Sequence, residues 1–403
     1  MKSDKSNICI LRQISQLIPS SLVNRLKGKY KIQTRGFSVW SHTLSHLFCQ
    51  LSHSLSLNDL CDNLANHEGI LRGMRGGSAP KRNTLSYANR NRDSGFAQDL
   101  FWDVLSHLQK LAPNFGTKYV KFPKGFTRNI YAIDSTTLPL VANNLDWAKH
   151  RNKKAAAKCH MQIKLNSFLP NFAIIKAANT HDSTEAKELC ANLVAGEVAL
   201  FDKAYVDYSH LFHLNKRGVF WVTRAKENMT YQVVEEISEA KGNILKDQKI
   251  KLSHQKSHDA YPEEFRLVEA LVEIDGKIQA MQFITNNFKW APSSVASLYQ
   301  ARWGIEVFFK LIKQNFQVTS FLGNNKNALQ WQIWMALLAY VLLRFLEFTS
   351  KWKHSFSRLF TLVKGVLWSY IDLNSLLKSY WTANSKVRQP PKEYHAYLPG
   401  LEW

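Results

Sequence analysis

Apolar residues recur three and four positions apart over much of the first 66 residues. Residues with this spacing share one side of a helix, and the pattern predicts helices over 10–18, 39–52 and 57–66. Basic turns separate these segments. A glycine-rich stretch at 72–82 then precedes a short polar helix that we expect over 83–92. The pattern therefore predicts a helical N-terminal domain over residues 1–110.

The hydrophobic period changes between residues 129 and 223. Short apolar runs bounded by turn residues predict strands, and the amphipathic stretches between them predict helices. In chain order the expected elements are strands 129–134, 160–168 and 172–178, a helix 184–193, a strand 198–202, a helix 208–217 and a strand 218–223. Three strands, helix, strand, helix, strand is the order of a ribonuclease H-like α/β fold.

Residues 226–285 interrupt this order. They are polar and charged, and alternating segments within them predict a β-rich insertion. From residue 293 onward the pattern is helical again, with breaks near residues 316 and 348. The expected organisation after the N-terminal domain is an α/β core over 125–225 and 286–320, the insertion over 226–285, and a helical C-terminal region over 321–403.

Charge indicates a polyanionic partner. The chain has 53 Lys and Arg against 31 Asp and Glu, a net charge of +22, and its 45% hydrophobic residues exclude wholesale disorder. The excess is distributed: residues 1–130 carry 19 basic and 7 acidic residues, and residues 321–403 carry 10 and 4. Distributed charge of this size indicates a large contact surface for nucleic acid. A basic but otherwise ordinary protein is the alternative.

Neither a membrane protein nor a secreted one is indicated. The N-terminus has no sustained apolar stretch of the signal-peptide type. The one long apolar run, 331–348, contains Gln332, Arg344 and Glu347, which predicts a buried helix rather than a membrane span. Five cysteines without a CxxC pair suit a reducing compartment. We therefore expect a cytoplasmic protein that does not act at a membrane.

One helix carries a metal-like pattern. Three histidines and a cysteine fall within about 60° of one another on it: His42, His46, Cys49 and His53. A single helix rarely closes a tetrahedral zinc shell, because the ligands normally converge from separate elements. A polar helix stripe is the preferred interpretation.

The basic residues around the glycine-rich turn suggest DNA contact. The order is a helix, a glycine-bearing turn and a second helix, which is compatible with a helix-turn-helix. The basic residues at or near the second helix are Lys81, Arg82 and Arg90. A plain helical bundle would give the same pattern.

Two acidic residues occupy matching places after apolar strands. Asp134 and Asp202 each stand at the end of a predicted strand, and neighbouring strands of one sheet would bring them together. Either aspartate taken alone has a simpler explanation as a turn residue. The repetition of the pattern favours a shared site.

A third acidic residue lies on a charged helix stripe. At 100° per residue five side chains fall on one side of the helix over 297–313: Tyr299, Arg302, Glu306, Lys310 and Lys313. The alternative is a solvated charged face. Three converging carboxylates would repel one another unless they bind cations, and two Mg²⁺ ions, with Mn²⁺ as a substitute, would suit phosphoryl transfer. Basic side chains beside Glu306 would then clamp phosphates.

The same helix carries a resemblance to a known family. The spacing Tyr-x2-Arg-x3-Glu-x6-Lys, formed by Tyr299, Arg302, Glu306 and Lys313, resembles the signature of the DDE transposases of bacterial insertion sequences, of the IS-four type. Ala132-Ile-Asp-Ser-Thr-Thr137 and Phe201-Asp-Lys-Ala-Tyr205 are similar to the motifs around that family's first two acidic residues. The gaps of 68 and 104 residues between the three acidic positions also suit the family.

The resemblance implies an enzyme that cuts and joins DNA. Its three acidic residues would hold the metal ions, and Tyr299, Arg302 and Lys313 would position DNA phosphates. Family members cut double-stranded DNA at terminal inverted repeats and then join the freed 3′-OH to target DNA, in some relatives through a hairpin. Trp303 and Trp290 would stack on a flipped base, although core packing is the alternative for both.

The family also implies a setting and two rivals. Its members act as homodimers in a synaptic complex, and a bacterial copy would be associated with the nucleoid. A structure-selective nuclease of the same fold is the enzymatic alternative. A descendant kept only as a DNA-binding protein is the non-enzymatic one.

Overall fold

The computed structural model describes residues 5–116, 126–139, 156–177, 182–274, 276–318, 320–323 and 325–380. Within them the chain forms two compact units, each described by itself below. One unit is built mainly from residues 5–115 and 310–380, and the other mainly from residues 126–137 and 158–309.

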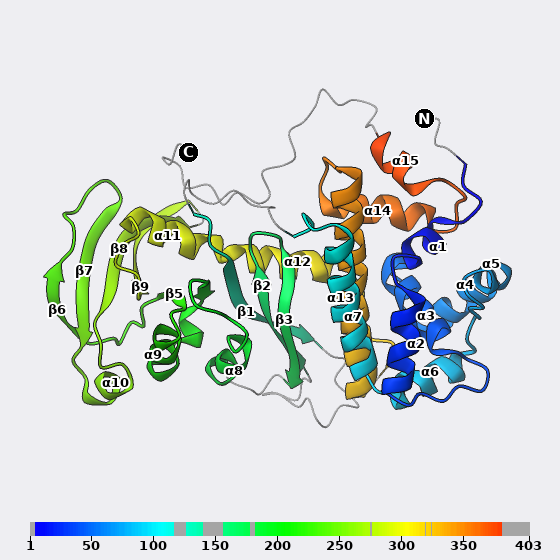
Figure 1. The fold of residues 1–403 in the computed structure, drawn as a ribbon, viewed down its shortest axis with the longest axis horizontal. Coiled ribbons are helices and arrows are strands. Elements are labelled where there is room, and N and C mark those ends of the chain that lie inside the picture. The colour runs from blue at the N-terminus through cyan, green and yellow to red at the C-terminus, as the bar shows by residue number, and fades with distance from the viewer. Residues whose placement is uncertain are drawn as a thin grey trace. The chain divides into compact units, whose positions relative to one another are not determined.

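The first unit is helical, and its helices come from both ends of the chain. They are α1 (Ile10–Ser15), α2 (Ser20–Lys29), α3 (Val39–Ser52), α4 (Leu57–Ala65), α5 (Glu68–Arg72), α6 (Arg82–Asn91), α7 (Gly95–Leu111), α13 (Lys326–Ser350), α14 (Phe356–Val366) and α15 (Leu373–Lys378). The N-terminal and C-terminal segments pack together, because α13 contacts α3, α6, α7 and α14. Figure 1 shows α7 and α13 side by side. The sequence pattern did not separate α2 or α7.

Helix α13 is the apolar run of the sequence. By length and composition it could cross a membrane, but 89% of its most apolar stretch is buried inside the protein. The buried-helix prediction is therefore confirmed. Gln332, near its start, donates to the carbonyls of Gln317 and Ser320. Arg344 pairs with Glu347 at 2.6 Å, so the polar side chains in the run have partners.

The second unit is a mixed α/β structure around one sheet. Its strands are β1 (Ile130–Pro139), β2 (Ala156–Lys164), β3 (Leu169–Ala177), β4 (Val198–Phe201), β5 (Phe220–Arg224), β6 (Tyr231–Glu236), β7 (Ile244–Leu252), β8 (Phe265–Ile274) and β9 (Lys277–Thr285). Its helices are α8 (Asp182–Leu189), α9 (Tyr208–Lys216), α10 (Gln255–Ala260), α11 (Pro292–Ala301) and α12 (Trp303–Asn315), which continues into the first unit.

The strands form one nine-stranded sheet in the order β3-β2-β1-β4-β5-β9-β8-β7-β6. β1, β4 and β5 are parallel, and β5 pairs with β9 in the antiparallel sense. This arrangement fits a ribonuclease H-like core. The four strands of the expected insertion, β6 to β9, extend the same sheet by antiparallel pairing (Figure 1).

The two faces of the central strands are covered by different helices. Alternate residues of β1 and β4, among them Tyr131, Ile133 and Phe201, belong to a core that also contains residues of α8 and α9. The intervening positions face the other side, where α11 packs on β4, β5, β8 and β9. Because both faces are buried, these strands are apolar almost without interruption.

One strand boundary differs from the prediction. β1 does not end at Asp134 but continues to Pro139. The residues that follow Asp134 are Ser-Thr-Thr-Leu, and threonine favours extended structure because its branched side chain fits a pleated surface. Asp134 therefore lies inside a strand.

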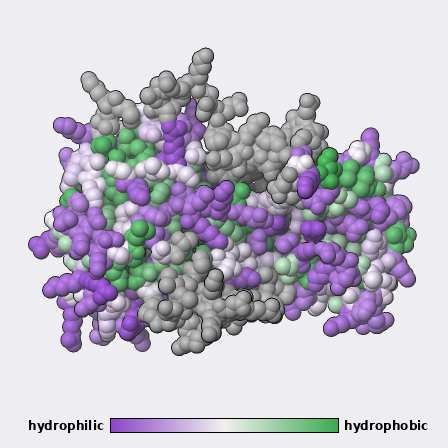
Figure 2. All heavy atoms as spheres, turned by 180° about the vertical axis from the view of Figure 1, so that it is seen from behind, coloured by the Kyte–Doolittle hydropathy of each residue, from purple (hydrophilic) through white to green (hydrophobic). Residues whose placement is uncertain are grey.

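The molecular face drawn in Figure 2 is mainly hydrophilic, with small separate hydrophobic areas.

Candidate active site

The sheet brings Asp134 and Asp202 together. β1 and β4 pair in register from Ile130 opposite Val198 to Ile133 opposite Phe201, so Asp134 and Asp202 are the next two residues in that register. Neighbouring strands lie about 4.8 Å apart, and residues in register on parallel strands point to the same face. Both aspartates therefore face the side of the sheet on which α11 packs.

The predicted single helix over 293–316 is two helices joined at Arg302. The amide of Arg302 donates to the carbonyl of Tyr299, and the amide of Ile305 donates to that of Arg302. Hydrogen bonds between residues three apart tighten a helix locally. This tightened turn at Arg302 separates α11 from α12. The side chains of Tyr299, Arg302 and Glu306 still share one face.

Gly304 determines how closely α12 approaches the sheet. A β-carbon at this position would lie only 3.1 Å from the side chains of Leu165 and Phe168, which belong to the turn between β2 and β3. A larger residue would therefore require these side chains, or the start of α12, to shift by a few tenths of an ångström. The carboxylate of Glu306 is two residues further along.

Arg302 joins two of the three acidic residues. One terminal nitrogen of its guanidinium lies 3.0 Å from Oδ2 of Asp134, and the other lies 2.7 Å from Oε1 of Glu306. The third acidic residue is contacted from the same helix face, because the hydroxyl of Tyr299 donates to Oδ1 of Asp202 at 3.2 Å. The structure therefore brings Asp134, Asp202, Tyr299, Arg302 and Glu306 into one cluster.

The cluster is electrostatically unusual. Burial raises the pKa of Asp134 to about 6, although Arg302 and the backbone amide of Ser135 oppose this shift. Burial also raises the pKa of Tyr299 to about 12. For Arg302 burial alone would lower the pKa, but Tyr299, Asp134 and Glu306 outweigh it, so the pKa is raised and the guanidinium stays charged.

The donor chemistry of the cluster fits a divalent cation. Carboxylate oxygens are the ligands that Mg²⁺ and Mn²⁺ prefer, and the family that the sequence resembles implies such ions. Within the part of the chain that the structure describes, no three acidic, histidine or cysteine side chains are grouped closely enough to hold a metal ion. Arg302 instead supplies the positive charge between Asp134 and Glu306.

The remaining predicted residues of this helix lie outside the cluster. Lys310 is exposed on α12 and Lys313 is half-buried, about one and two turns beyond Glu306. Trp303 is half-buried at the start of α12. Trp290 packs against the rings of Phe126 and Phe220, with centroids 5.2 and 5.3 Å away.

Helix α6 presents the predicted basic residues to solvent. Lys81, Arg82 and Arg90 are exposed, and no ion pair involves them among the described residues. Arg92, at the end of α6, is different. Its guanidinium donates to the carbonyls of Phe37 and Ser38 and holds the helix in place.

Two histidines of the predicted polar stripe on α3 form a buried hydrogen-bonded group. His42 and His46 each contact Oδ1 of Asn89 through Nε2 at 2.8 Å, and His53 caps the helix in a left-handed conformation. In the described residues nothing around them is grouped as a metal site. Helix α3 is buried from Val39 to Leu51, so its polar side chains lie inside the protein.

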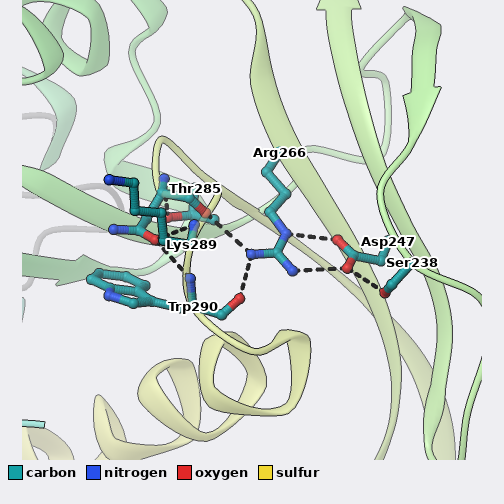
Figure 3. Close-up of polar contacts among 7 residues, drawn as sticks. Ser238, Asp247, Arg266, Thr285, Lys289 and Trp290 are labelled. Carbon is teal, nitrogen blue, oxygen red and sulfur yellow. Dashed lines mark hydrogen bonds and ion pairs between the residues drawn. The ribbon is translucent and has the colours of Figure 1, made fainter. Parts of the chain in front are cut away.

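A further buried ion pair was not predicted from the sequence. Arg266 on β8 forms a two-pronged contact with Asp247 on β7, at 2.6 and 2.8 Å, and also donates to the carbonyls of Asn287 and Trp290 just before α11 (Figure 3). The available signal was a charged residue inside the apolar run Phe265-Arg-Leu-Val. Its partner lies on another strand, which the run does not reveal.

Comparison with known proteins gives the family. Residues 125–342 match the model of the transposase DDE domain, and residues 6–74 match a domain of unknown function. The chain is 30% identical over 271 residues to a Sinorhizobium fredii protein described as the transposase y4zB, and the match covers 66% of this chain and 71% of that protein. It is 25% identical over 253 residues to a Geobacillus stearothermophilus protein described as the transposase of insertion sequence element IS5377, covering 62% and 65%.

A solved structure is more distantly similar. The piggyBac transposase in a synaptic complex with hairpin DNA aligns over 91% of this chain and 83% of that one, with a TM-score of 0.46 and 9% identity. The DDE domain model spans more than half of the chain, and the Sinorhizobium relative is 30% identical. The chain therefore belongs to the DDE transposases of insertion sequences and is a DNA transposase.

Proposed function

We propose that this transposase cuts and joins DNA through Asp134, Asp202 and Glu306. One observation supports this most directly: Arg302 and Tyr299, on consecutive turns of one helix face, contact all three carboxylates. Acidic residues that share a buried site repel one another, and the raised pKa of Asp134 reflects that cost together with burial. Grouping these carboxylates is electrostatically unfavourable unless a cation compensates their charge, and this is the expected property of a cation-binding site.

Each side chain has a proposed role. The three carboxylates hold divalent metal ions, Mg²⁺ or Mn²⁺, and such a pair stabilises the attacking and leaving oxygens of phosphoryl transfer. Tyr299, Arg302, Lys310 and Lys313 position DNA phosphates, because a guanidinium matches two phosphate oxygens and ammonium groups add point charge. Trp303, half-buried on the same helix, contacts a base.

A second DNA contact is proposed at α6. Between residues 69 and 92 the chain has six basic residues and no acidic one. The outer face of α6 carries Asn83, Tyr87 and Arg90, and Tyr87 is 71% exposed. Asn and Arg are the side chains that read adenine and guanine edges, so this face would bind the terminal repeats.

The wider setting follows from the family. We propose that the protein acts in the bacterial cytoplasm at the nucleoid, as a homodimer that joins two terminal inverted repeats in a synaptic complex and then inserts them into target DNA. Hairpin formation at the cut ends is part of the test below.

The test uses purified full-length protein and linear DNA carrying the repeats that flank its gene, with Mg²⁺ or with EDTA. Asp134→Asn, Asp202→Asn and Glu306→Gln should each lower cleavage at least about a hundredfold, because each removes a negative ligand, while repeat binding is kept. Glu239→Gln, at an exposed carboxylate between β6 and β7, is the matched control.

The outcomes separate the candidates. Mg²⁺-dependent cuts at the repeat tips that the three variants lose support the proposal, and a hairpin product identifies the pathway. Cutting that ignores the repeats would point to a structure-selective nuclease. Binding of the repeats without any cutting would point to a DNA-binding descendant. If the Glu306→Gln variant still cleaves DNA substantially, the assignment of Glu306 to the active site is wrong.

A further inference from the structure

We infer that Arg302 acts as an internal cation that holds Asp134 and Glu306 in the DNA-free protein, and that it must release them before a divalent metal ion binds with full affinity. The inference rests on the proposed function of the three carboxylates. It adds a regulatory role for an arginine to which the proposed function assigns only phosphate contact.

The contacts of Arg302 carry this inference. Its two terminal nitrogens bond to different carboxylates, Asp134 at 3.0 Å and Glu306 at 2.7 Å. The proposed function assigns both carboxylates to metal ions, so Arg302 and a metal ion would compete for them. An arginine and a divalent cation cannot share these oxygens without strong repulsion between like charges in a buried site.

The burial of the three partners is unequal. The Arg302 side chain is 7% exposed and that of Asp134 is 19% exposed, whereas the Glu306 side chain is 54% exposed. Asp134 is therefore the carboxylate that depends most on Arg302 for compensation, because water screens Glu306. Loss of Arg302 without a replacement cation would leave a buried negative charge at Asp134.

Arg302 is also incompletely satisfied where it lies. Its Nε is buried and has no hydrogen-bond partner among the described residues. A guanidinium gains two parallel bonds from one phosphate, which its present split arrangement does not provide. A DNA phosphate near the cluster would therefore compete for Arg302 and free both carboxylates for metal.

The local backbone allows such a change. Arg302 is the single residue between α11 and α12, and the hydrogen bonds on both sides of it are of the tightened, three-residue kind. Tyr299, whose ring lies under the guanidinium at 5.4 Å, is held separately by Asp202. Movement of the Arg302 side chain would leave that contact in place.

The experiment measures Mn²⁺ binding to metal-free full-length protein by calorimetry, without DNA and with duplex DNA carrying the terminal repeat. Arg302→Gln removes the charge and keeps a hydrogen-bond donor, and should bind Mn²⁺ about tenfold more tightly than wild type without DNA. Arg302→Lys keeps the charge and should stay close to wild type. Arg72→Gln, in the exposed Arg72–Glu68 pair of α5 with the same four-residue spacing, is the matched control.

Linkage provides a second readout that needs no variant. DNA should tighten Mn²⁺ binding to wild type about tenfold, since DNA draws Arg302 away, and should tighten binding to Arg302→Gln much less. Circular dichroism establishes that each variant is folded. Two results would overturn the inference. One is that Arg302→Gln binds Mn²⁺ no more tightly than wild type does, and the other is that DNA does not raise the Mn²⁺ affinity of the wild type.

Asp134→Asn separates this inference from the proposed function. In the Arg302→Gln background it should cancel the gain in Mn²⁺ affinity, and a gain that persists would lie at another site and contradict the inference. If Asp134→Asn weakens Mn²⁺ binding while Arg302→Gln changes nothing, only the role of Arg302 fails. If Asp134→Asn affects neither Mn²⁺ binding nor cleavage, the proposed site fails as well.

Discussion

Single residues in this transposase are placed where their charge is hard to accommodate. An aspartate with a pKa raised to about 6 destabilises the folded protein at neutral pH, where it must be ionised. Asp134 is such a residue, and a neutral side chain would pack there at lower cost. Its presence beside Arg302 is therefore better explained by chemistry than by stability.

The buried histidines give a contrasting case, in which a polar group serves structure. His42 and His46 share one oxygen of Asn89 and lie against the ring of Trp331, with centroids 4.2 and 5.6 Å away. Both Nε2 atoms donate to this oxygen, and burial disfavours the charged form of both rings. Burial lowers the pKa of His46 to about 4, and it lowers that of His42 well below its ordinary value.

This geometry predicts acid sensitivity. Because the folded protein keeps the rings neutral, the unfolded chain binds more protons as the pH falls below 6.5. The stability is fully present above that pH. Protonation of His46 should remove about 1.4 kcal/mol per pH unit down to a pH of about 4, and His42, whose pKa is also lowered, should add to this loss. Urea unfolding at several pH values measures this loss.

A variant isolates the contribution of one ring. His46→Gln keeps a donor for Asn89 but cannot titrate, so its unfolding free energy should depend less steeply on pH. His107→Gln, at a half-buried position on α7, should keep the wild-type slope. Equal slopes for wild type and His46→Gln would show that the cluster does not control acid stability.

At the scale of elements, the extended half of the sheet holds the segment that leads into the site. Arg266 binds Asp247 across β7 and β8 and also two carbonyls of the loop before α11 (Figure 3). Asn287 continues this loop by accepting from the amides of Lys289 and Trp290. Strands β7 and β8 therefore help to position α11, the helix that carries Tyr299.

The Arg266–Asp247 pair should contribute strongly to stability when it is broken from one side. Both side chains are almost fully buried, so Arg266→Met leaves Asp247 as an uncompensated charge and should cost about 3–5 kcal/mol. Replacing both residues, as Arg266→Met with Asp247→Leu, should restore most of that loss. Urea denaturation of the single and double variants measures the difference.

The neighbouring exposed pair is the control. Lys246 and Glu269 contact at 2.8 Å on the same two strands, but Lys246 is 45% exposed. Lys246→Met should therefore cost less than about 1 kcal/mol. If the double variant at Arg266 and Asp247 is as unstable as the single variant, the contacts of Arg266 with the loop before α11, and not the buried charge, dominate the loss of stability.

At the scale of the whole molecule, the net charge of +22 is the dominant property. Within the described residues the exposed cations Lys81, Arg82 and Arg90 lie at one helix, while others, such as Arg25 and Lys29, are paired with acidic residues of α7. The unpaired ones remain available for phosphates. DNA binding should consequently weaken steeply with salt.

The salt dependence tests the surface of α6. Arg90→Gln should reduce the slope of log K against log salt by about one if Arg90 contacts a phosphate, and should instead relax sequence preference if it reads a base. Arg25→Gln, whose guanidinium is paired with Asp103, should leave both unchanged. Arg90→Gln with an unaltered slope and unaltered preference would exclude this helix face from the interface.

The sequence by itself determined the features that depend on neighbours along the chain. The short apolar runs at 129–134 and 198–202 predicted the two strands that lead to Asp134 and Asp202. The helical spacing of Tyr299, Arg302 and Glu306 placed these three residues on one side of a helix. The sequence resemblance rests on the same local motifs, and the comparisons confirm the coarser part of it, a DDE transposase of insertion sequences.

The tertiary structure alone decided which of these elements meet. Asp134 and Glu306 are 172 positions apart, and only the sheet order and the packing of α11 bring both to Arg302. The same holds for the packing of α13 against α3 and α7, and for Arg266 with the loop before α11. Contacts between distant segments depend on the whole topology, which no short window of sequence encodes, and so the bridging role of Arg302 became visible only in the folded chain.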